Sequence, residues 1–233
     1  MATGYILTEA LAVTASRPAW QTSFELALIV ATTLLAAALA RDVLRASLEF
    51  EGFWILPIAL LLGVLSADFA TGAVHWFCDS FFAADTPIVG RALVAPFREH
   101  HVDPLGITRH GLLELHGNSC IPLIALLLAA RALLSAEAAP GLLVHSSLLF
   151  FTLATMATNQ CHRWAHEISP GPAVRWFQRA GLILSPEVHA RHHRGEFRQS
   201  YCMTTGWMNP LLDRLRFFPR LEQGIRALNP SRH

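Results

Sequence analysis

Histidines at short, regular spacings are the residues of this chain best suited to chemistry. Among twelve histidines in 233 residues, His189, His192 and His193 follow an i, i+3, i+4 pattern. A helix would bring these three imidazoles onto one patch of its surface. Ser185 and Pro186 favour a helix start just before them, as N-cap and first-turn residues. Because three convergent imidazoles on a solvated face have little structural purpose, the pattern predicts metal ligands.

Two further histidine pairs have spacings that suit metal binding. His162 and His166 are four residues apart, so their rings can converge on one ion from one face of a helix. His100 and His101 are adjacent, and on a helix they would point about 100° apart. They can therefore serve two different metals, or one metal and one supporting role. Asn159, just ahead of the first pair, is a candidate ligand or a residue that supports the ligands.

A histidine between two aspartates lies at the end of the second apolar stretch. Asp68, His75 and Asp79 are separated by seven and then four residues, which places them on one helical face. An aspartate within an apolar span is costly and normally faces the bundle interior. Asp68 is therefore expected to orient a histidine ligand, or else to be satisfied by hydroxyl groups of a neighbouring helix. Asp79 is a candidate metal ligand or hydrogen-bond partner of a ligand.

Nine histidines remain as candidate ligands when three others are set aside. Those set aside are His116, the terminal His233, and His145, which lies within a span and is expected to be a hydrogen-bonded packing histidine. The nine are His75, His100, His101, His110, His162, His166, His189, His192 and His193. A tetrahedral zinc site needs only three or four ligands, whereas nine imidazoles suit two ions of higher coordination number with a position left open. Imidazole binds iron, zinc, copper and nickel, so these residues predict a site without identifying the element.

Four apolar stretches must position these clusters. The chain is 53% hydrophobic and 15% charged, and about 20 apolar residues cross a bilayer core. We therefore predict an all-α, single-domain integral membrane protein over residues 1–233, with spans at 24–40, 53–76, 120–134 and 140–158. The third stretch is short and carries Arg131, so a re-entrant or interfacial helix is the alternative there. The histidine-rich segments 75–116 and 159–209 are expected to form a helical cap.

Arginine positions predict the orientation of the spans. Four spans place both termini and the loop after the second span on one side, and only Arg41, Arg45 and Arg131 lie on the other. Because short cytoplasmic segments accumulate basic residues, the cap and both termini should face the cytoplasm, here of a bacterial inner membrane. The first stretch begins too late for a cleaved signal peptide to be expected.

Composition argues against several other classes of protein. A net charge of +1 gives no reason to propose a nucleic-acid surface. The four cysteines are scattered and include no Cys-x-x-Cys pair, so neither a disulfide framework nor a thiolate zinc site is indicated.

Several strings around the histidine clusters resemble those of one membrane enzyme family. They run in order as Gly72-Ala73-Val74-His75-Trp76, Phe97-Arg98-Glu99-His100-His101, Ile107-Thr108-Arg109-His110, Thr158-Asn159-Gln160, His162 with His166, His189-x-x-His192-His193, and Tyr201 through Asn209. They are similar to the lipid desaturase family that includes plasmanylethanolamine desaturase, Kua and CarF proteins, and a plant plastid acyl-lipid desaturase. The resemblance implies two iron ions, O2 as co-substrate, and a double bond introduced into the alkyl or acyl chain of a membrane phospholipid or ether lipid. In the plasmalogen-forming members the product is a vinyl ether.

The chain departs from the plasmalogen-forming members at two places. In those members an aspartate follows the position of His110 and an asparagine stands at the position of His116, whereas this chain has Gly111 and His116. They also carry Pro-His where this chain reads Glu196-Phe197. His116 is therefore the candidate to replace the histidine expected at the Phe197 position.

The predicted chemistry needs electrons from outside the chain. The sequence contains neither a Gly-x-Gly-x-x-Gly segment nor a Cys-x-x-Cys-His haem attachment, so a cytochrome b5-like or ferredoxin-like donor is implied. A hydroxylase using the same site shares the first hydrogen abstraction and stays an alternative. A zinc-dependent membrane hydrolase would leave most of the histidines unexplained, and a metal transporter would place its ligands near the middle of the spans.

Overall fold

The described part of the chain is entirely helical. The computed structural model describes residues 18–49, 51–83, 85–87, 90, 94–133, 139–194 and 196–228. Its helices are α2 (Ala19–Glu49), η1 (Gly52–Ile55), α3 (Leu56–Phe81), α4 (Ala95–Val102), η3 (Gly106–Arg109), α5 (Leu112–Leu133), α6 (Ala139–His166), α7 (Pro172–Arg179), α8 (Pro186–His192), α9 (Asn209–Arg214) and α10 (Phe217–Leu228). No strand occurs in these ranges, which confirms the all-α prediction.

Four of these helices are long and apolar enough to cross a membrane, so the chain is a multi-pass membrane protein. They are α2, α3 together with η1, α5 and α6. The third begins at Leu112 rather than Cys120, because the polar residues ahead of the apolar run continue the helix. Its 22 residues correspond to about 33 Å, enough for a bilayer core. Likewise α3 and α6 continue beyond the predicted spans and carry His75, His162 and His166 in their last turns.

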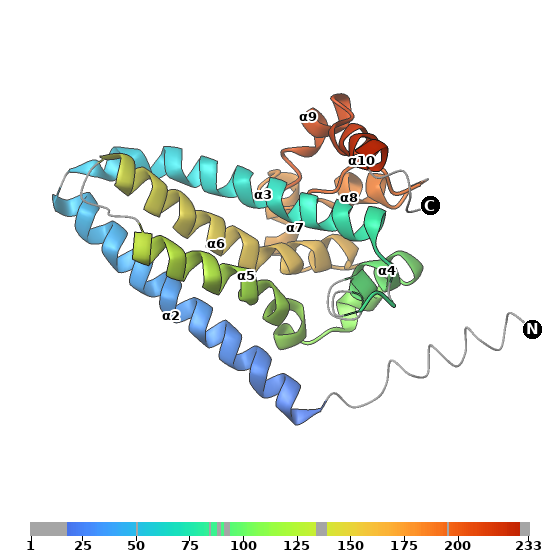
Figure 1. Ribbon diagram of the computed structural model, residues 1–233, viewed down its shortest axis with the longest axis horizontal. Coiled ribbons are helices and arrows are strands. Elements are labelled where there is room, and N and C mark those ends of the chain that lie inside the picture. The colour runs from blue at the N-terminus through green and yellow to red at the C-terminus, as the bar shows by residue number, and fades with distance from the viewer. Residues whose placement is uncertain are drawn as a thin grey trace, which may run out of the picture.

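The long helices pack as two close pairs, α3 with α6 and α2 with α5 (Figure 1). A core of leucines that includes Leu39, Leu127 and Leu142 joins α2, α5 and α6. At Gly63 the backbones of α3 and α6 approach each other closely. A Cβ atom there would lie 2.6 Å from the carbonyl oxygen of Ser147. Small residues permit such close helix contacts in membranes, where van der Waals packing drives association.

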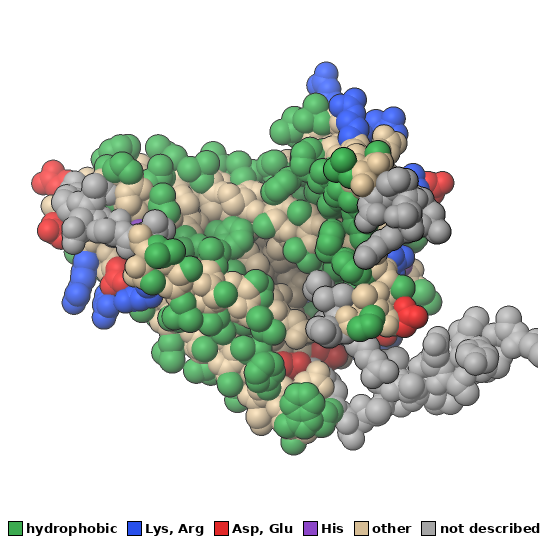
Figure 2. Space-filling view, in the orientation of Figure 1, with side chains coloured by type: hydrophobic (Ala, Val, Ile, Leu, Met, Phe, Trp, Pro, Cys, Tyr) green, Lys and Arg blue, Asp and Glu red, His purple; other side chains and the backbone are tan. Residues whose placement is uncertain are grey.

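Hydrophobic side chains cover the long helices, and charged side chains gather mostly toward the two ends (Figure 2). At one end Arg131 forms a 2.8 Å ion pair with Asp42 of α2. This contact explains how a charge is tolerated near the end of the short third span, because the arginine has a carboxylate partner there.

The shorter helices α4 and α7–α10 gather around the opposite end of the bundle, where α3 and α6 end (Figure 1). α10 packs directly on α3, since Phe69 lies 5.7 Å from Phe217 and 6.3 Å from Phe218 between ring centroids. Trp76, Tyr201 and the same Phe218 continue this contact as a buried cluster. The cap is therefore joined to the last turns of α3 by aromatic packing.

Candidate metal centre

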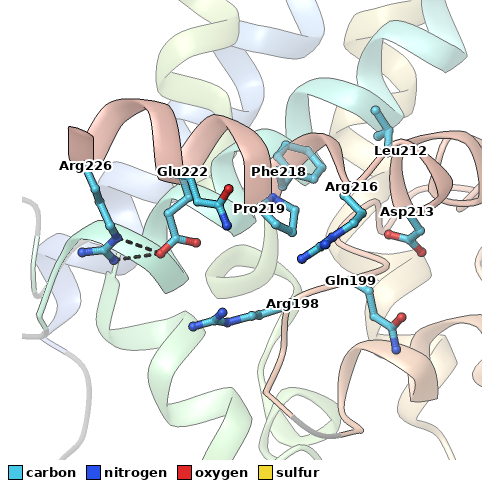
Figure 3. A pocket seen from close by; sticks show the side chains of 10 residues that line it. Arg198, Gln199, Leu212, Asp213, Arg216, Phe218, Pro219, Glu222 and Arg226 are labelled. Carbon is cyan, nitrogen blue, oxygen red and sulfur yellow. Dashed lines mark hydrogen bonds and ion pairs between the residues drawn. The ribbon is translucent and has the colours of Figure 1, made fainter. Parts of the chain in front are cut away.

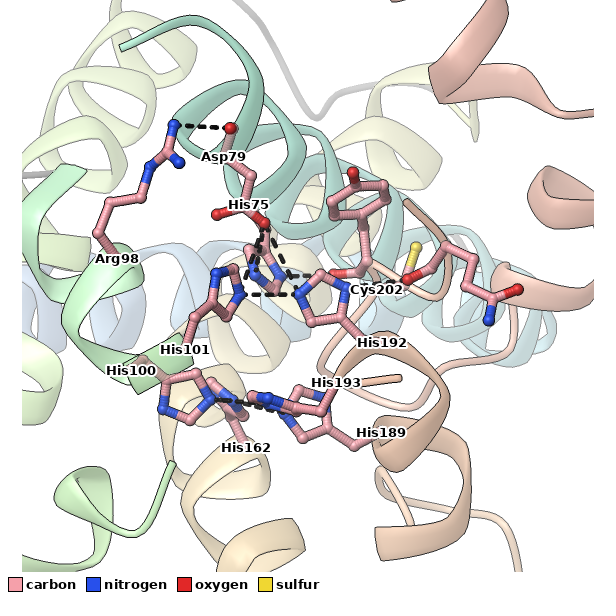
Figure 4. A network of polar contacts seen from close by, with 12 residues as sticks. His75, Asp79, Arg98, His100, His101, His162, His189, His192, His193 and Cys202 are labelled. Atoms are coloured by element: carbon pink, nitrogen blue, oxygen red, sulfur yellow. Dashed lines mark hydrogen bonds and ion pairs between the residues drawn. The ribbon is translucent and has the colours of Figure 1, made fainter. Parts of the chain in front are cut away.

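The histidine clusters meet in the cap as two adjacent groups, seen as two tiers in Figure 4. Within each group the ligand atoms all lie within 4.8 Å of one another. The first group is His100, His162, His166, His189 and His193. The second group is His75, Asp79, His101 and His192. The groups adjoin, because the ring centroids of His101 and His193 are only 5.7 Å apart.

Two of the contributing helices supply ligands to both groups. On α4, His100 joins the first group and His101 the second, as their angular separation on a helix allows. At α8, His189 and His193 face the first group, whereas His192 faces the second. The single patch expected of these three histidines is therefore divided, since positions i+3 and i+4 differ by about 100° around the axis.

The first group cannot be held together by hydrogen bonds among its histidines alone. The Nε2 atoms of His100, His162, His189 and His193 form a closed ring of contacts of 2.9–3.1 Å. Each neutral Nε2 carries either one hydrogen or one lone pair, so at most two of the four contacts can be hydrogen bonds. In addition, the buried Nε2 of His166 has no hydrogen-bond partner among the described residues. A cation at the centre would satisfy all five lone pairs, and five imidazoles are a suitable donor set for a transition metal.

In the second group a carboxylate faces three imidazoles. Asp79 Oδ2 lies 3.3 Å from Nε2 of His75, 3.7 Å from that of His101 and 3.6 Å from that of His192. Both Asp79 oxygens are buried without a hydrogen-bond partner among the described residues. An uncompensated buried carboxylate is costly, so this arrangement also fits a bound cation.

Backbone carbonyls determine which ring nitrogen faces the second group. Nδ1 of His75 donates to the carbonyl of Tyr201 at 3.2 Å, and Nδ1 of His192 donates to that of Gln199 at 2.9 Å. With the proton on Nδ1, Nε2 presents its lone pair to the site, as metal-ligating histidines commonly do. Lone pairs directed at a carboxylate repel it, and a cation between them would reverse that interaction.

The histidines of the cap helices are neutral at physiological pH. Burial, followed by repulsion from neighbouring imidazoles, lowers the pKa of His100 to about 2. Burial is also the main cause that lowers the pKa of His101 to about 4 and that of His192 to about 3. These rings therefore keep the lone pairs that metal binding requires.

Asp68 supports the site without joining either group. Its Oδ1 accepts hydrogen bonds from the backbone N–H groups of Thr204, Thr205 and Gly206 at 3.0–3.1 Å, and Oδ2 accepts one from Met208 at 3.1 Å. Asp68 is fully buried, and backbone amides satisfy it rather than hydroxyl groups. It thus anchors the segment that begins at Tyr201, whose carbonyl orients His75.

The structure brings neither Asn159 nor His145 into the two groups. The Asn159 side chain donates to the carbonyl of Leu115 and to Ser119 Oγ, and so joins α6 to α5. His145 is buried, and its Nδ1 donates to the carbonyl of Gly141 in the same helix at 2.8 Å. Its position is that of a packing histidine.

His110 and His116 also lie outside both groups. The His110 side chain is 40% exposed and lies 3.8 Å from Glu114. The His116 ring hydrogen-bonds the carbonyl of Met156. Phe197 stacks on His101 with ring centroids 4.3 Å apart. Phe197 occupies the position where the family resemblance led us to expect a histidine, which His116 was the candidate to replace. The two groups therefore contain eight of the nine candidate histidines together with the candidate Asp79. His116 does not take the Phe197 position.

Sequence reasoning missed the carbonyls of Gln199 and Tyr201 and the stacking role of Phe197. No periodic pattern marks these residues, because a backbone carbonyl has no side-chain signature. The only available signal was the string from Tyr201 to Asn209, which carried the family resemblance without indicating a role.

Comparison with known proteins identifies the family of this chain. A lipid desaturase domain model matches residues 64–232. The chain is 42% identical over 204 residues to the plasmanylethanolamine desaturase of Myxococcus xanthus, covering 87% of this chain and 71% of that protein. It is 36% identical over 206 residues to plasmanylethanolamine desaturase 1 of Mus musculus, covering 86% and 75% respectively. Fatty acid desaturase 4, chloroplastic, of Arabidopsis thaliana is 31% identical, with 82% of this chain and 57% of that protein covered. No solved structure gives a significant match.

Proposed function

This chain belongs to the lipid desaturase family and is an oxidoreductase, and from this premise we propose that its two histidine groups bind two iron ions. The observation that supports the proposal is the convergence of eight buried or half-buried imidazoles and one carboxylate in two adjoining sets. A hydrolytic zinc site needs only three or four protein ligands. The nine donors of the two sets together exceed that need and suit a pair of redox-active ions.

The residues assigned to the first iron are His100, His162, His166, His189 and His193. Those assigned to the second are His75, Asp79, His101 and His192. Iron bound there would supply oxygen activation, the chemistry that removal of two hydrogens from unactivated C–H bonds requires and that no side chain provides.

The remaining contacts of the chain keep these ligands in place. The carbonyls of Tyr201 and Gln199 hold the second-group imidazoles in the tautomer that presents Nε2. Arg98 donates to the carbonyls of Asp79 at 2.7 Å and Phe82 at 2.9 Å, which ties α4 to the end of α3. This contact fixes the position of the α4 histidines relative to His75 and Asp79 of α3.

For the substrate we propose the 1-O-alkyl chain of an ethanolamine ether phospholipid, which becomes a vinyl ether. Two relatives named plasmanylethanolamine desaturase, each matched over more than two thirds of its length, support this choice. The fatty acid desaturase among the relatives makes an acyl-lipid desaturase the second candidate. A hydroxylase on the same site would add oxygen to the lipid instead of removing hydrogen.

The reaction removes two hydrogens from the lipid while O2 is reduced to two molecules of water. The two further electrons come from an external donor, and the two further protons come from the solvent. We propose a cytochrome b5-like or ferredoxin-like protein as that donor. The arginine distribution supports a cytoplasmic cap, where a soluble or membrane-attached donor would reach it.

Metal analysis combined with a lipid assay tests this proposal. Purified protein should contain close to two irons per chain. Supplied with electrons and an ether phospholipid, it should form a product two hydrogens lighter by mass spectrometry, and only when O2 is present. A protein with one zinc whose activity persists without oxygen would overturn the proposal in favour of a hydrolase.

A further inference from the structure

A charged pocket beside the second metal group has no role in the chemistry described so far. It has a volume of about 540 Å³ and is lined by residues of the segment after α8, by α9 and by α10. This volume lies within the usual range of about 300–1,000 Å³ for small-molecule sites. Arg216 reaches into it from the connection between α9 and α10, and Arg198 from the segment after α8 (Figure 3).

The pocket presents positive charge that the protein only partly neutralises. Its lining contains Arg198, Arg216 and Arg226 but only two acids. Glu222 is paired with Arg226 at 2.9 Å, and Asp213 accepts two 2.9 Å hydrogen bonds from Ser200. Among the residues that the structure describes, the ion-pair partner of Arg198 is a highly exposed glutamate outside this lining, at 3.3 Å, and such surface pairs contribute little. Arg198 and Arg216 are therefore available to bind an anion that enters the pocket.

Backbone strain is concentrated around the same pocket. Among the described residues only four non-glycine residues have positive φ, and three of them are Phe197, Ser200 and Arg216. The left-handed conformation costs of the order of 1 kcal/mol or more and persists where the surrounding structure imposes it, frequently at ligand sites. Here it directs the Arg216 side chain from a tight connection into the pocket.

A second, smaller cavity lies between this pocket and residues of the second group. It has a volume of about 210 Å³, shares Arg198, Glu222 and Arg226 with the first, and reaches Asp79 and His101 of the second group. The shared walls place the larger pocket next to the second group, in the direction that a ligand bound there would have to extend to reach it.

The position of the pocket favours a membrane lipid over a soluble anion. Its wall α10 packs on α3, a membrane-spanning helix, through Phe69, and exposes Leu221, Ile225 and Leu228. An amphipathic helix in this place lies at the membrane surface, where phosphate headgroups are found.

We propose that Arg198 and Arg216 bind the phosphate of the substrate phospholipid, which places the headgroup-proximal part of its chain at the second metal group. Arginine forms charge-assisted, often bidentate hydrogen bonds with phosphate. The two acids in the lining suit a headgroup with a single phosphate better than a multiply charged anion. This inference rests on the proposed function, because it assigns a role to the pocket only if a lipid is the substrate.

The test compares Arg198→Gln and Arg216→Gln with the control Arg220→Gln, which removes the same charge from an exposed position of α10 outside the pocket. The full chain in detergent micelles is titrated with a fluorescent 1-O-alkyl-2-acyl-glycerophosphoethanolamine and with 1-O-alkyl-2-acylglycerol, which lacks the phosphate. Both pocket variants should weaken phospholipid binding about 10- to 100-fold, the usual effect of losing a charge-assisted hydrogen bond. Binding of the phosphate-free lipid should stay within twofold of the control.

Several results would overturn the proposal. The proposal is wrong if both pocket variants bind the phospholipid as tightly as Arg220→Gln does. It is also wrong if the pocket variants lose affinity equally for the phospholipid and for the phosphate-free lipid. Slower reduction of the protein by its electron donor with unchanged lipid binding would instead identify a docking surface for that donor. Displacement of the lipid by equimolar inorganic phosphate would indicate a site for a soluble anion. If the expected binding pattern appears but no lipid is desaturated, the proposed function fails and the phosphate site stands.

Discussion

At the residue scale, the orientation and tautomer of each candidate ligand histidine depend on what its second ring nitrogen contacts. His75 and His192 have Nδ1 bonded to carbonyls, so their Nε2 lone pairs are directed into the site before any ion binds. His100 and His189 have buried Nδ1 atoms without a hydrogen-bond partner among the described residues. The second group is therefore the more preorganised, and its ring orientations depend on the backbone segment that carries Gln199 and Tyr201.

Replacement of single histidines should separate ligands from packing residues. His189→Ala and His192→Ala should each reduce bound iron to about one ion per chain or fewer and abolish desaturation, because each removes a ligand from a different group. His145→Ala should keep both irons and most activity, at a stability cost of about 1 kcal/mol for its lost hydrogen bond. Iron content and lipid products measure these effects, and two irons with normal turnover in both ligand variants would show that the assigned site is wrong.

The metal-free protein should become less stable as the pH falls below neutrality. Burial lowers the pKa values of His100 and His101 to about 2 and 4, whereas in the unfolded chain they are near 6.5. Between pH 6.5 and about 4 the unfolded state binds more protons, so the free energy of unfolding decreases as the pH falls. For each such histidine, the decrease in the free energy of unfolding approaches about 1.4 kcal/mol per pH unit.

Thermal unfolding of chelator-treated protein at pH 7.5 and pH 5 measures this effect. The apparent midpoint temperature should be lower at pH 5, and His100→Gln should reduce the difference. A midpoint that does not change between the two pH values would contradict the burial of neutral imidazoles.

At the element scale, Asp68 connects a spanning helix to the segment that orients His75. Asp68→Ala would leave several buried N–H groups without an acceptor, at a cost of about 1–3 kcal/mol for each unsatisfied group. We expect lower thermal stability and selective loss of the second iron, because the Tyr201 carbonyl loses its anchor. Asp68→Asn, which retains one acceptor oxygen, should be milder. Equal iron content in Asp68→Ala and the unmodified protein would contradict this supporting role.

The contact between α3 and α6 depends on a glycine. Gly63→Ala would place a Cβ atom 2.6 Å from the Ser147 carbonyl oxygen, and overpacking of this kind costs about 1–3 kcal/mol. Gly224→Ala in α10 is the matched control, because a Cβ atom added there would meet no atom within 4 Å among the described residues, and alanine there should stabilise the helix by about 0.5–1 kcal/mol. Thermal midpoints that fall for the first variant and rise for the second would support the close contact, and equal midpoints would exclude it.

At the scale of the whole molecule, the eight histidines of the two groups occupy one end of the bundle, and the Arg131–Asp42 pair lies near the other. The arginine distribution then predicts that the metal centre faces the cytoplasm. Reporter fusions in the loop between α2 and α3, and after the last residue, should report opposite sides of the membrane, with the second cytoplasmic. Reporters on the same side would contradict the four-span topology.

The sequence by itself determined the helical class, the four apolar runs, and most of the histidines that the two groups contain. These features are local: hydropathy depends on consecutive residues, and the spacing of His162 and His166 or of His189 and His193 determines which rings share a helix face.

Only the tertiary structure decided how the candidate ligands divide into two groups and which candidates lie outside them. His192 lies in a different group from His189 and His193, Asp79 lies in the second group, and His110 lies outside both groups. Each of these outcomes depends on how four separate helices converge. The role of Asp68 was likewise undetermined by sequence, since its partners are backbone amides more than a hundred residues away along the chain. Local patterns specify which face a side chain occupies, and tertiary packing specifies what that face meets.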